Sequence, residues 1–192
     1  MSVWLIKETV RFLEENLTKD MNVFEYGSGG STLFFAERAR EVISIEHNPI
    51  WWRKINALIE SAHRTNVTLK LIEAERNPAY WGKNLPETES YISKRWGYRK
   101  LGFKNYVTSI DDYPNDYFDV ILIDGRARPS CLAHAKSKVK MGGYLILDDA
   151  ERFRYRHACE SLAGPEWSRR NDWGLRPYRF YLSSTCVWKR LR

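Results

Sequence analysis

The sequence contains little cysteine, and its cysteines are widely spaced. The 192 residues include only Cys131, Cys159 and Cys186, with no CxxC pair among them. An odd number of distant cysteines supports neither a disulfide framework nor a zinc knuckle. The four histidines form no HxxxH pair and no Ser/His/Asp-like pattern, so zinc chemistry and triad hydrolysis also have no support.

A long apolar run is missing as well. The densest apolar stretches, residues 120–123 and 144–147, have the length of strands, far below the roughly 20 residues needed to cross a bilayer. Near the N-terminus, Glu8, Glu14 and Glu15 interrupt the apolar segment that a signal peptide requires. We therefore expect no membrane association and a cytoplasmic location.

Positive charge is in excess, and it is unevenly distributed. The formal net charge is +7; residues 76–106 carry +5 and residues 151–192 carry +6, while the rest of the chain is acidic. Two basic segments that converge on one face would attract a phosphate, a carboxylate or nucleic acid. Solvated surface charge is the alternative. With 43% hydrophobic residues, the chain has enough apolar surface for one domain spanning residues 1–192.

Apolar periodicity alternates between strand and helix along the chain. Strands are predicted at residues 23–24, 42–45, 67–72, 120–123 and 144–147, with one or two more within 178–191. Helices are predicted at residues 6–17, 31–39, 49–62, 130–138 and 151–163. This alternation predicts an α/β fold with three layers, in which helices cover both faces of a doubly wound, mostly parallel sheet.

Residues 76–106 interrupt this pattern and are predicted to form an insertion or long loop. The segment contains several Pro and Gly residues and is rich in aromatic and basic side chains. The aromatic residues are Tyr80, Trp81, Tyr91, Trp96, Tyr98, Phe103 and Tyr106. Stacking rings between cations are what single-stranded nucleic acid requires, so this insertion is the expected substrate-recognition element. A satellite hydrophobic cluster beneath a long loop is the alternative.

Several predicted strands end in acidic residues, and the first runs into a glycine loop. Ligands of doubly wound sheets bind at the carboxyl ends of the strands. Gly27 and Gly29 lack the Cβ atoms that would keep a ligand from the backbone N–H groups of the loop. Glu46 follows Gly29 by 17 residues, at the end of the next strand, where a carboxylate can accept hydrogen bonds from both hydroxyls of a ribose. The arrangement predicts an adenosine-containing cofactor.

The residues of the loop distinguish between two such cofactors. A dinucleotide fingerprint needs Gly or Ala at position 32, where this chain has Thr32. The sequence Glu25-Tyr26-Gly27-Ser28-Gly29 instead resembles the acid-x-Gly-x-Gly motif of the class I S-adenosylmethionine-dependent methyltransferases. The resemblance covers nearly the whole chain, including an acid after the fourth strand and a strand-rich C-terminus, although Ser31 replaces the usual third glycine.

The resemblance implies a Rossmann-like methyltransferase fold and a set of cofactor-binding residues. These residues are Glu25, Gly27, Ser28, Gly29, Glu46, His47 and Asp124. Glu46 would hold the ribose, His47 would pack beside the adenine, and Asp124 would lie near the methionine moiety or the transferred methyl group. The residue that contacts the adenine from the end of the third strand is either Glu73 or Glu75.

The acids after the fourth and fifth strands are the expected catalytic residues. Asp124, Asp148 and Asp149 are also similar to the magnesium ligands of the catechol O-methyltransferase type, and three carboxylates suit a hard cation. Three nearby arginines offer neutralisation without a metal, which is the interpretation we favour: Arg126, Arg128 and Arg152. Without a metal, one of the acids acts as the base.

The sequence therefore predicts an S-adenosylmethionine-dependent methyltransferase with a small or sugar-like acceptor. Arg126 and Arg128 follow the fourth strand directly and are expected to clamp an anionic group of that acceptor. An RNA methyltransferase is an alternative, although the chain lacks the Asn/Asp-Pro-Pro-Tyr tetrad typical of enzymes that methylate base amines. A Rossmann-like module that binds a nucleotide or nucleic acid without turnover is the other alternative.

Overall fold

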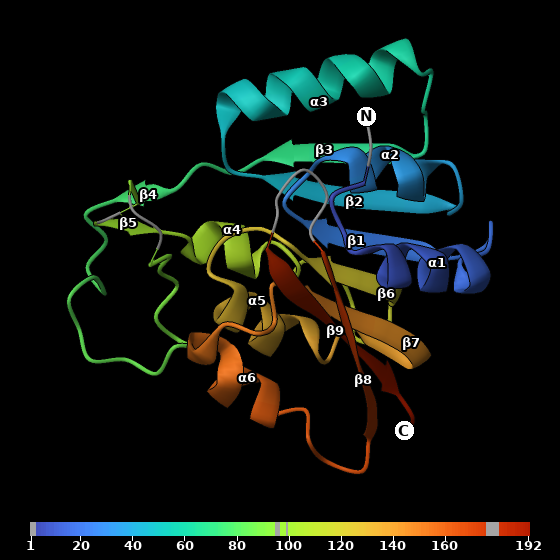
Figure 1. The fold of residues 1–192 in the computed structure, drawn as a ribbon. Coiled ribbons are helices and arrows are strands. Elements are labelled where there is room, and N and C mark those ends of the chain that lie inside the picture. The colour runs from blue at the N-terminus through green and yellow to red at the C-terminus, as the bar shows by residue number, and fades with distance from the viewer. Residues whose placement is uncertain (1–2, 95–96, 99, 176–180) are drawn as a thin grey trace.

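A seven-stranded sheet forms the centre of the molecule (Figure 1). The computed structural model describes residues 3–94, 97–98, 100–175 and 181–192. The parallel strands are β1 (Asn22–Tyr26), β2 (Glu41–Glu46), β3 (Val67–Leu71), β6 (Phe118–Ile123) and β7 (Val139–Asp148). The antiparallel strands are β8 (Trp167–Leu175) and β9 (Leu182–Arg190). The order β3-β2-β1-β6-β7-β9-β8 confirms the predicted doubly wound, mostly parallel sheet.

Helices cover both faces of the sheet, which gives the predicted three layers. One face carries α1 (Lys7–Asn16) and α2 (Gly30–Ala36). The other carries α4 (Lys104–Thr108), α5 (Arg128–Ala135) and α6 (Arg156–Glu160), and α3 (Pro49–Ser61) packs against β2 and β3. The chain leaves β1 toward β2 and returns to β6 on the opposite side, so the switch point lies between β1 and β6.

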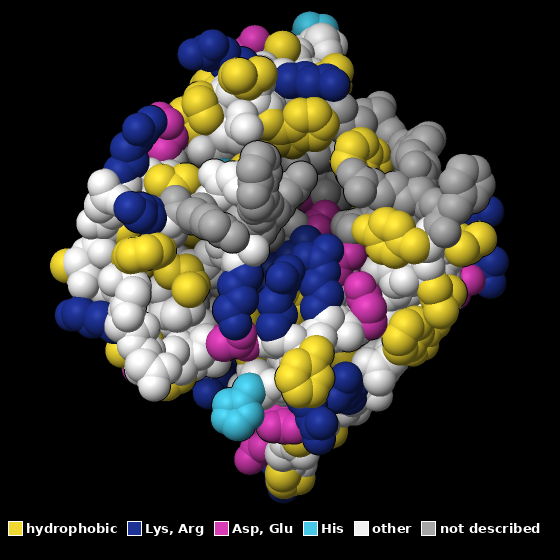
Figure 2. Space-filling model, turned by 60° about the vertical axis from the view of Figure 1, so that its left-hand side comes forward, with side chains coloured by type: hydrophobic (Ala, Val, Ile, Leu, Met, Phe, Trp, Pro, Cys, Tyr) yellow, Lys and Arg dark blue, Asp and Glu magenta, His cyan; other side chains and the backbone are white. Residues whose placement is uncertain are grey.

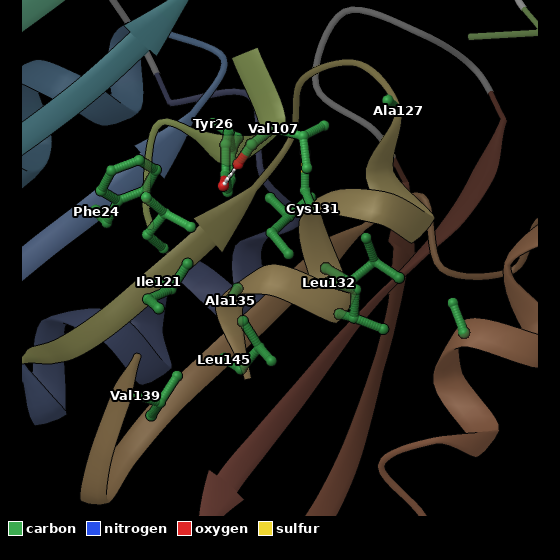
Figure 3. Packing of buried hydrophobic residues seen from close by; sticks show 14 of the residues in the cluster. Phe24, Tyr26, Val107, Ile121, Ala127, Cys131, Leu132, Ala135, Val139 and Leu145 are labelled. Atoms are coloured by element: carbon green, nitrogen blue, oxygen red, sulfur yellow. Dashed lines mark hydrogen bonds between the residues drawn. The ribbon is translucent and has the colours of Figure 1, made fainter. Parts of the chain in front are cut away.

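Alternating side chains of the parallel strands fill the core on both sides of the sheet. In β1, Val23 packs toward α1 and α2, whereas Phe24 and Tyr26 pack toward α4 and α5 (Figure 3). The Tyr26 hydroxyl donates a hydrogen bond to the Val107 carbonyl at 2.5 Å, which satisfies its polar atom inside the core. Burying one such apolar side chain stabilises the fold by about 1.5–3 kcal/mol.

The helix prediction at Asn48 and Pro49 is confirmed in detail. The Asn48 side-chain oxygen accepts hydrogen bonds from the backbone N–H groups of Ile50 and Trp51, both at 3.0 Å. Pro49 is the first residue of α3, where its missing N–H has no helical partner to lose. The cap fixes the direction in which the chain leaves the end of β2.

Two strand predictions were wrong. The strand predicted at 144–147 begins earlier, at Val139, so that Gly142 and Gly143 lie inside β7, where the register against β6 shifts. Gly142 has φ +80°, and a Cβ on Gly143 would lie 2.8 Å from the Asp119 carbonyl, so the pair forms a bulge that no other residue fits. The strand β8 was not predicted, because its exposed polar residues hide the alternation; of the predicted segment 178–191, residues 178–180 lie outside the described residues.

Two helix predictions were wrong in extent. α5 begins at Arg128, two residues before the predicted start, with Pro129 in its first turn. The helix predicted at 151–163 is a short 3₁₀ turn, η1 (Phe153–Tyr155), followed by the five residues of α6. None of the described helices is both long and apolar enough to span a membrane.

The insertion leaves and rejoins the fold through a two-stranded ribbon. β4 (Glu75–Arg76) pairs antiparallel with β5 (Leu101–Gly102), and α4 begins inside the predicted insertion and ends two residues beyond it, at Thr108. Phe103 and Tyr106 are fully buried in the core. Tyr80, Tyr91 and Tyr98 each pack against other rings. The described aromatic residues of the insertion therefore mostly form the satellite cluster; the exposed Trp81 is the exception among them, and Trp96 lies outside the described residues.

Candidate functional site

A cavity of about 760 Å³ lies at the carboxyl ends of the parallel strands. One side, here called the β1/β2 wall, consists of residues 27–31 and 46–48. The opposite side, the β6/β7 wall, consists of residues 124–129, Asp149, Arg152, Arg154 and Tyr155. Figure 2 brings this edge of the molecule forward and shows Lys and Arg side chains gathered at its centre, with acidic side chains beside them. The volume is typical of a site for a cofactor or small ligand.

The two glycines of the loop after β1 serve different purposes. Gly27 has φ +95°, and a Cβ there would lie 2.8 Å from the Cα of Gly125, so it is required by the contact between the two strand ends. Gly29 has extended backbone. A Cβ on Gly29 would meet only the Ser31 hydroxyl, at 4.0 Å, on a residue that borders the cavity. The missing side chain at Gly29 therefore leaves space for a ligand in the cavity, whereas the missing side chain at Gly27 leaves space for the backbone of Gly125.

Glu46 lies at the end of β2 with its carboxylate turned to the loop. One oxygen accepts hydrogen bonds from the Ser28 backbone N–H at 3.2 Å and from its hydroxyl at 3.1 Å. The other accepts from the backbone N–H groups of His47 and Asn48 at 2.9 and 2.8 Å. Burial would raise the pKa of Glu46, but the hydrogen bonds from His47 and from these backbone groups outweigh it and lower the pKa. The carboxylate is held ionised at the cavity wall.

Glu25 lies behind the loop rather than on the cavity wall. It is fully buried, and its carboxylate accepts hydrogen bonds from the hydroxyls of Ser31, Thr32 and Ser44, the last two at 2.6 Å. Burial raises the pKa of Glu25 to about 7, although the three hydroxyls oppose the shift. Thr32 also accepts from the Gly29 backbone N–H at 2.9 Å, so Glu25 supports the loop from below.

Trp51 is a cavity residue that the sequence analysis missed. Its indole N–H donates to the Ser28 carbonyl at 2.8 Å, which ties α3 to the glycine loop. The neighbouring Trp52 instead turns toward β3 and donates to the Leu69 carbonyl at 3.3 Å. Consecutive helical residues point about 100° apart, so two adjacent tryptophans cannot both face the core. This spacing is the feature of the sequence that could have identified Trp51.

The loop after β6 rests on a buried tyrosine. Tyr106 is fully buried, and a Cβ on Gly125 would overlap its hydroxyl. Glycine at position 125 therefore lets the loop that begins with Asp124 cross directly over the Tyr106 ring. The sequence analysis identified Asp124 but gave no reason for the glycine after it.

His47, Tyr98 and Arg126 form a contiguous group between the cavity and a smaller hollow beside it. The Nε2 atom of His47 lies 2.9 Å from the Tyr98 hydroxyl and 3.4 Å from Nε of Arg126, and the Arg126 guanidinium lies 4.7 Å from the centre of the Tyr98 ring. Glu73 lines the smaller hollow. Glu75 accepts instead from the Tyr80 hydroxyl and the Asn105 backbone, which leaves Glu73 the better placed of the two acids considered for adenine.

The predicted acids of the β6/β7 wall converge on one buried arginine. The guanidinium of Arg128 lies 2.7 Å from the carboxylate of Asp124, 3.3 Å from that of Asp149 and 3.9 Å from that of Asp148. It also donates to the carbonyls of Asp124, Gly125 and Asp148. Burial disfavours its charge, but the carboxylates, Asp124 foremost, raise the pKa of Arg128. The predicted substrate clamp at Arg128 does not fit this placement, because its donors are taken up by the protein.

Asp148 and Asp149 are adjacent but differently placed. Asp148 is buried beside Thr185, whose hydroxyl donates to it at 3.0 Å, and it does not border the cavity. Asp149 borders the cavity and accepts hydrogen bonds from Arg152 and from the Ser183 hydroxyl. Of the predicted catalytic acids, the structure therefore brings Asp124 and Asp149 to the cavity.

The three carboxylates do not form a magnesium site in this arrangement. The Arg128 guanidinium lies between them and supplies the positive charge that a cation would bring. No group of three or more His, Cys, Asp or Glu residues in the described part of the chain could hold a metal ion. We derive no chemistry through a metal.

The strand order and the cavity at the carboxyl ends of the strands are those of a Rossmann-like methyltransferase fold. Comparison with solved structures supports this assignment of the fold. The chain is similar to an rRNA methylase from Streptococcus thermophilus, with a TM-score of 0.64 and 12% identity over 96% of this chain and 95% of that one. It is also similar to an O-methyltransferase from Bacillus cereus in complex with SAH, with a TM-score of 0.63 and 16% identity over 88% and 74% of the chains. A tRNA (m1A58) methyltransferase from Aquifex aeolicus gives a TM-score of 0.58 and 14% identity over 99% and 71%.

These identities are low, and the likeness is one of fold. No protein-family model matches the sequence, and no curated protein matches it.

Proposed function

We propose that the protein is an S-adenosylmethionine-dependent methyltransferase with a small or sugar-like acceptor that carries an anionic group. One observation carries this proposal: the glycine loop and the ionised Glu46 form one wall of a single cavity, and the acids after β6 and β7 border the other. The similar solved structures, one of which contains SAH, support it. The two walls suit a cofactor and an acceptor that meet between them.

The residues of the β1/β2 wall fit the cofactor. Gly29 leaves open space at the backbone of the loop, and Glu46 faces that space from the end of β2. We infer that a ribose hydroxyl replaces the Ser28 hydroxyl, now 3.1 Å from Glu46, as a donor to that carboxylate. His47 and Glu73 would lie on the adenine side. Glu25 keeps the loop in shape through Ser31 and Thr32 and makes no direct contact in this proposal.

The residues of the β6/β7 wall would align the acceptor and take its proton. S-adenosylmethionine, when bound, supplies a methyl group attached to a positively charged sulfur. A hydroxyl acceptor must lose a proton as it is methylated, and Asp149 and Asp124 are the carboxylates that border the cavity from the β6/β7 wall. Asp148 supports this wall through Arg128 and Thr185. Alignment and exclusion of water are the remaining contributions of the enzyme.

An RNA acceptor is the second candidate, and one observation favours it. Phe153 is 85% exposed between Arg152 and Arg154, both of which border the cavity. An exposed ring between two cations can stack on an unpaired base while the cations contact phosphates.

Calorimetric titration with S-adenosylmethionine and SAH tests the proposal, with NAD as the comparison ligand. We expect micromolar binding of both sulfur compounds and none of NAD. Glu46→Gln should weaken binding at least tenfold, because a neutral amide oxygen is a weaker acceptor for the ribose hydroxyl than a carboxylate, and the amide NH₂ group cannot accept at all. Glu41→Gln, at the opposite end of β2, is the matched control and should bind like the wild type. Binding of nucleic acid without either sulfur compound would favour the non-catalytic module.

A further inference from the structure

Residues 149–155 form a short segment that brings two arginines from the end of β7 to the cavity. Arg152 and Arg154 both border the cavity, as do Asp149 at the start of the segment and Tyr155 at its end. Neither Arg154 nor Tyr155 was singled out by the sequence pattern. In the 3₁₀ turn of η1 residues three apart lie on one side, which places Arg152 and Tyr155 on the same side and Phe153 outward.

This segment is tied to the sheet rather than free. The Ala150 backbone N–H donates to the Ser184 carbonyl at 2.8 Å. The Glu151 carboxylate accepts from the Ser184 backbone N–H at 2.9 Å and from the Ser183 hydroxyl at 3.2 Å. These bonds anchor the segment to β9, so the two arginines start from a fixed backbone and lose little freedom when they bind a ligand.

The two arginines differ in what they contact. Arg152 donates to the Asp149 carboxylate. Arg154 donates to the Tyr155 hydroxyl at 3.2 Å and lies 5.0 Å from that ring. Among the described residues Arg154 has no carboxylate partner, unlike the buried Arg128. Because the Tyr155 oxygen accepts from Arg154, its own proton is available to a further acceptor in the cavity.

We propose that Arg152, Arg154 and the Tyr155 hydroxyl form a binding site for a small oxyanion, a phosphate or carboxylate group of the acceptor. This inference rests on the proposed function and names the substrate class for it. Two guanidinium groups and a phenol supply donors for several oxygens of one anionic group. An anion on Arg152 competes with Asp149 for that guanidinium, while Arg128 stays 3.3 Å from the same carboxylate.

The enclosed placement favours a small molecule over RNA as the source of the anion. Tyr155 is buried, and the side chain of Arg152 is 34% exposed. Residues 87, 90 and 92–94 of the insertion line the cavity on another side, so the donors face a cavity that the insertion borders. A phosphate within a polymer would have to enter this space with its two neighbouring sugars.

The test is a titration of the full chain, saturated with SAH, with inorganic phosphate and with succinate. We expect phosphate or succinate to bind at the site, and the tighter of the two identifies the chemistry of the group. Arg152→Gln and Arg154→Gln should each weaken that binding at least tenfold. Arg156→Gln is the matched control, because Arg156 belongs to the next turn, pairs with Glu160 and does not border the cavity. Arg154→Lys, which keeps the charge, should recover part of the binding.

The outcomes separate the two proposals. If the wild type does not bind SAH, the methyltransferase proposal itself is wrong. Two results would overturn the anion site alone, provided that SAH binds normally. In one, phosphate and succinate bind equally to all variants; in the other, neither anion binds the wild type. A single-stranded oligonucleotide that binds more tightly than either anion, and loses affinity in Arg156→Gln as well as Arg154→Gln, would replace the anion site with a nucleic-acid surface. Unchanged melting temperatures of the variants would show that the arginines act on the ligand.

Discussion

The two walls of the cavity are held together by different interactions. In the β1/β2 wall, carboxylates meet hydroxyls and backbone N–H groups: Glu25 accepts from Ser31, Thr32 and Ser44, and Glu46 accepts from the loop. In the β6/β7 wall, carboxylates meet guanidinium groups, chiefly that of Arg128. One wall is built chiefly from hydroxyl and backbone N–H donors, and the other from ion pairs.

This difference bears on what each wall can do. Among the described residues, the Glu46 oxygen that faces the loop accepts only from the Ser28 hydroxyl and backbone N–H, so it can exchange a protein hydroxyl for a ribose hydroxyl at little electrostatic cost. In the ion-paired wall, any group that approaches Asp149 competes with a cation. Binding on the first wall is therefore a simple exchange, whereas chemistry on the second requires a rearrangement of charge.

Removing the central cation should have the largest effect on stability. Arg128→Met would remove the guanidinium that Asp124, Asp148 and Asp149 share, and we expect it to lower the free energy of unfolding at pH 7 by about 3–5 kcal/mol. Urea denaturation measures the change. Arg156→Met, which breaks an exposed pair with Glu160, should cost less than about 1 kcal/mol. Equal losses in the two variants would contradict the view that the β6/β7 wall depends on Arg128.

The same difference explains how much of the site the sequence could predict. The glycine loop and Glu46 were found because their spacing follows from local geometry: a turn needs glycine, and the next strand ends beside it. Arg128 was expected both to neutralise the acids after the fourth and fifth strands and to hold substrate; the structure places it beside those acids, where the protein takes up its donors. Trp51 and Tyr155 were missed because their roles depend on which way a ring turns after the helix is packed.

The predicted fold followed the same rule. Buried strands and the capped helix at Asn48 carry strong local signals, and the structure has them at the predicted positions. The strand β8 carries no such local signal, because Asp172 is its only buried residue. It forms a strand by pairing with β9, which lies later in the sequence. The bulge at Gly142 and Gly143 needs the neighbouring Asp119 carbonyl to explain it, which no pattern within β7 shows.

The two loop glycines allow the β1/β2 wall to be broken in two separate ways. Gly27→Ala places a Cβ 2.8 Å from the Gly125 backbone at φ +95°, and we expect a loss of about 4 kcal/mol in the free energy of unfolding. Gly29 has extended backbone and open space beside it, so Gly29→Ala should lower the free energy of unfolding by less than about 1 kcal/mol.

The Gly29→Ala variant should instead bind SAH at least tenfold more weakly, because the added methyl group enters the space assigned to the cofactor. Urea denaturation and calorimetry on both variants give the two quantities independently. A folded Gly29→Ala chain with wild-type SAH affinity would contradict the assignment of that space, while leaving the structural role of Gly27 intact.

The buried Glu25 gives an expected effect that depends on pH. Its pKa is raised from 4.5 to about 7 in the folded chain, so the unfolded chain loses this proton first as the pH rises. Stability from this group is complete below pH 4.5 and declines until the pH passes 7. Glu25→Gln lacks this decline. The difference in free energy of unfolding between this variant and the wild type should therefore shift in favour of the variant by about 2.5 kcal/mol between pH 5 and pH 8. Ser44→Ala removes a hydroxyl that favours the ionised form and should move the end of the decline to higher pH. A difference between Glu25→Gln and the wild type that stays constant across this range would mean that Glu25 is ionised throughout, and that the β1/β2 wall holds a second charge beside Glu46.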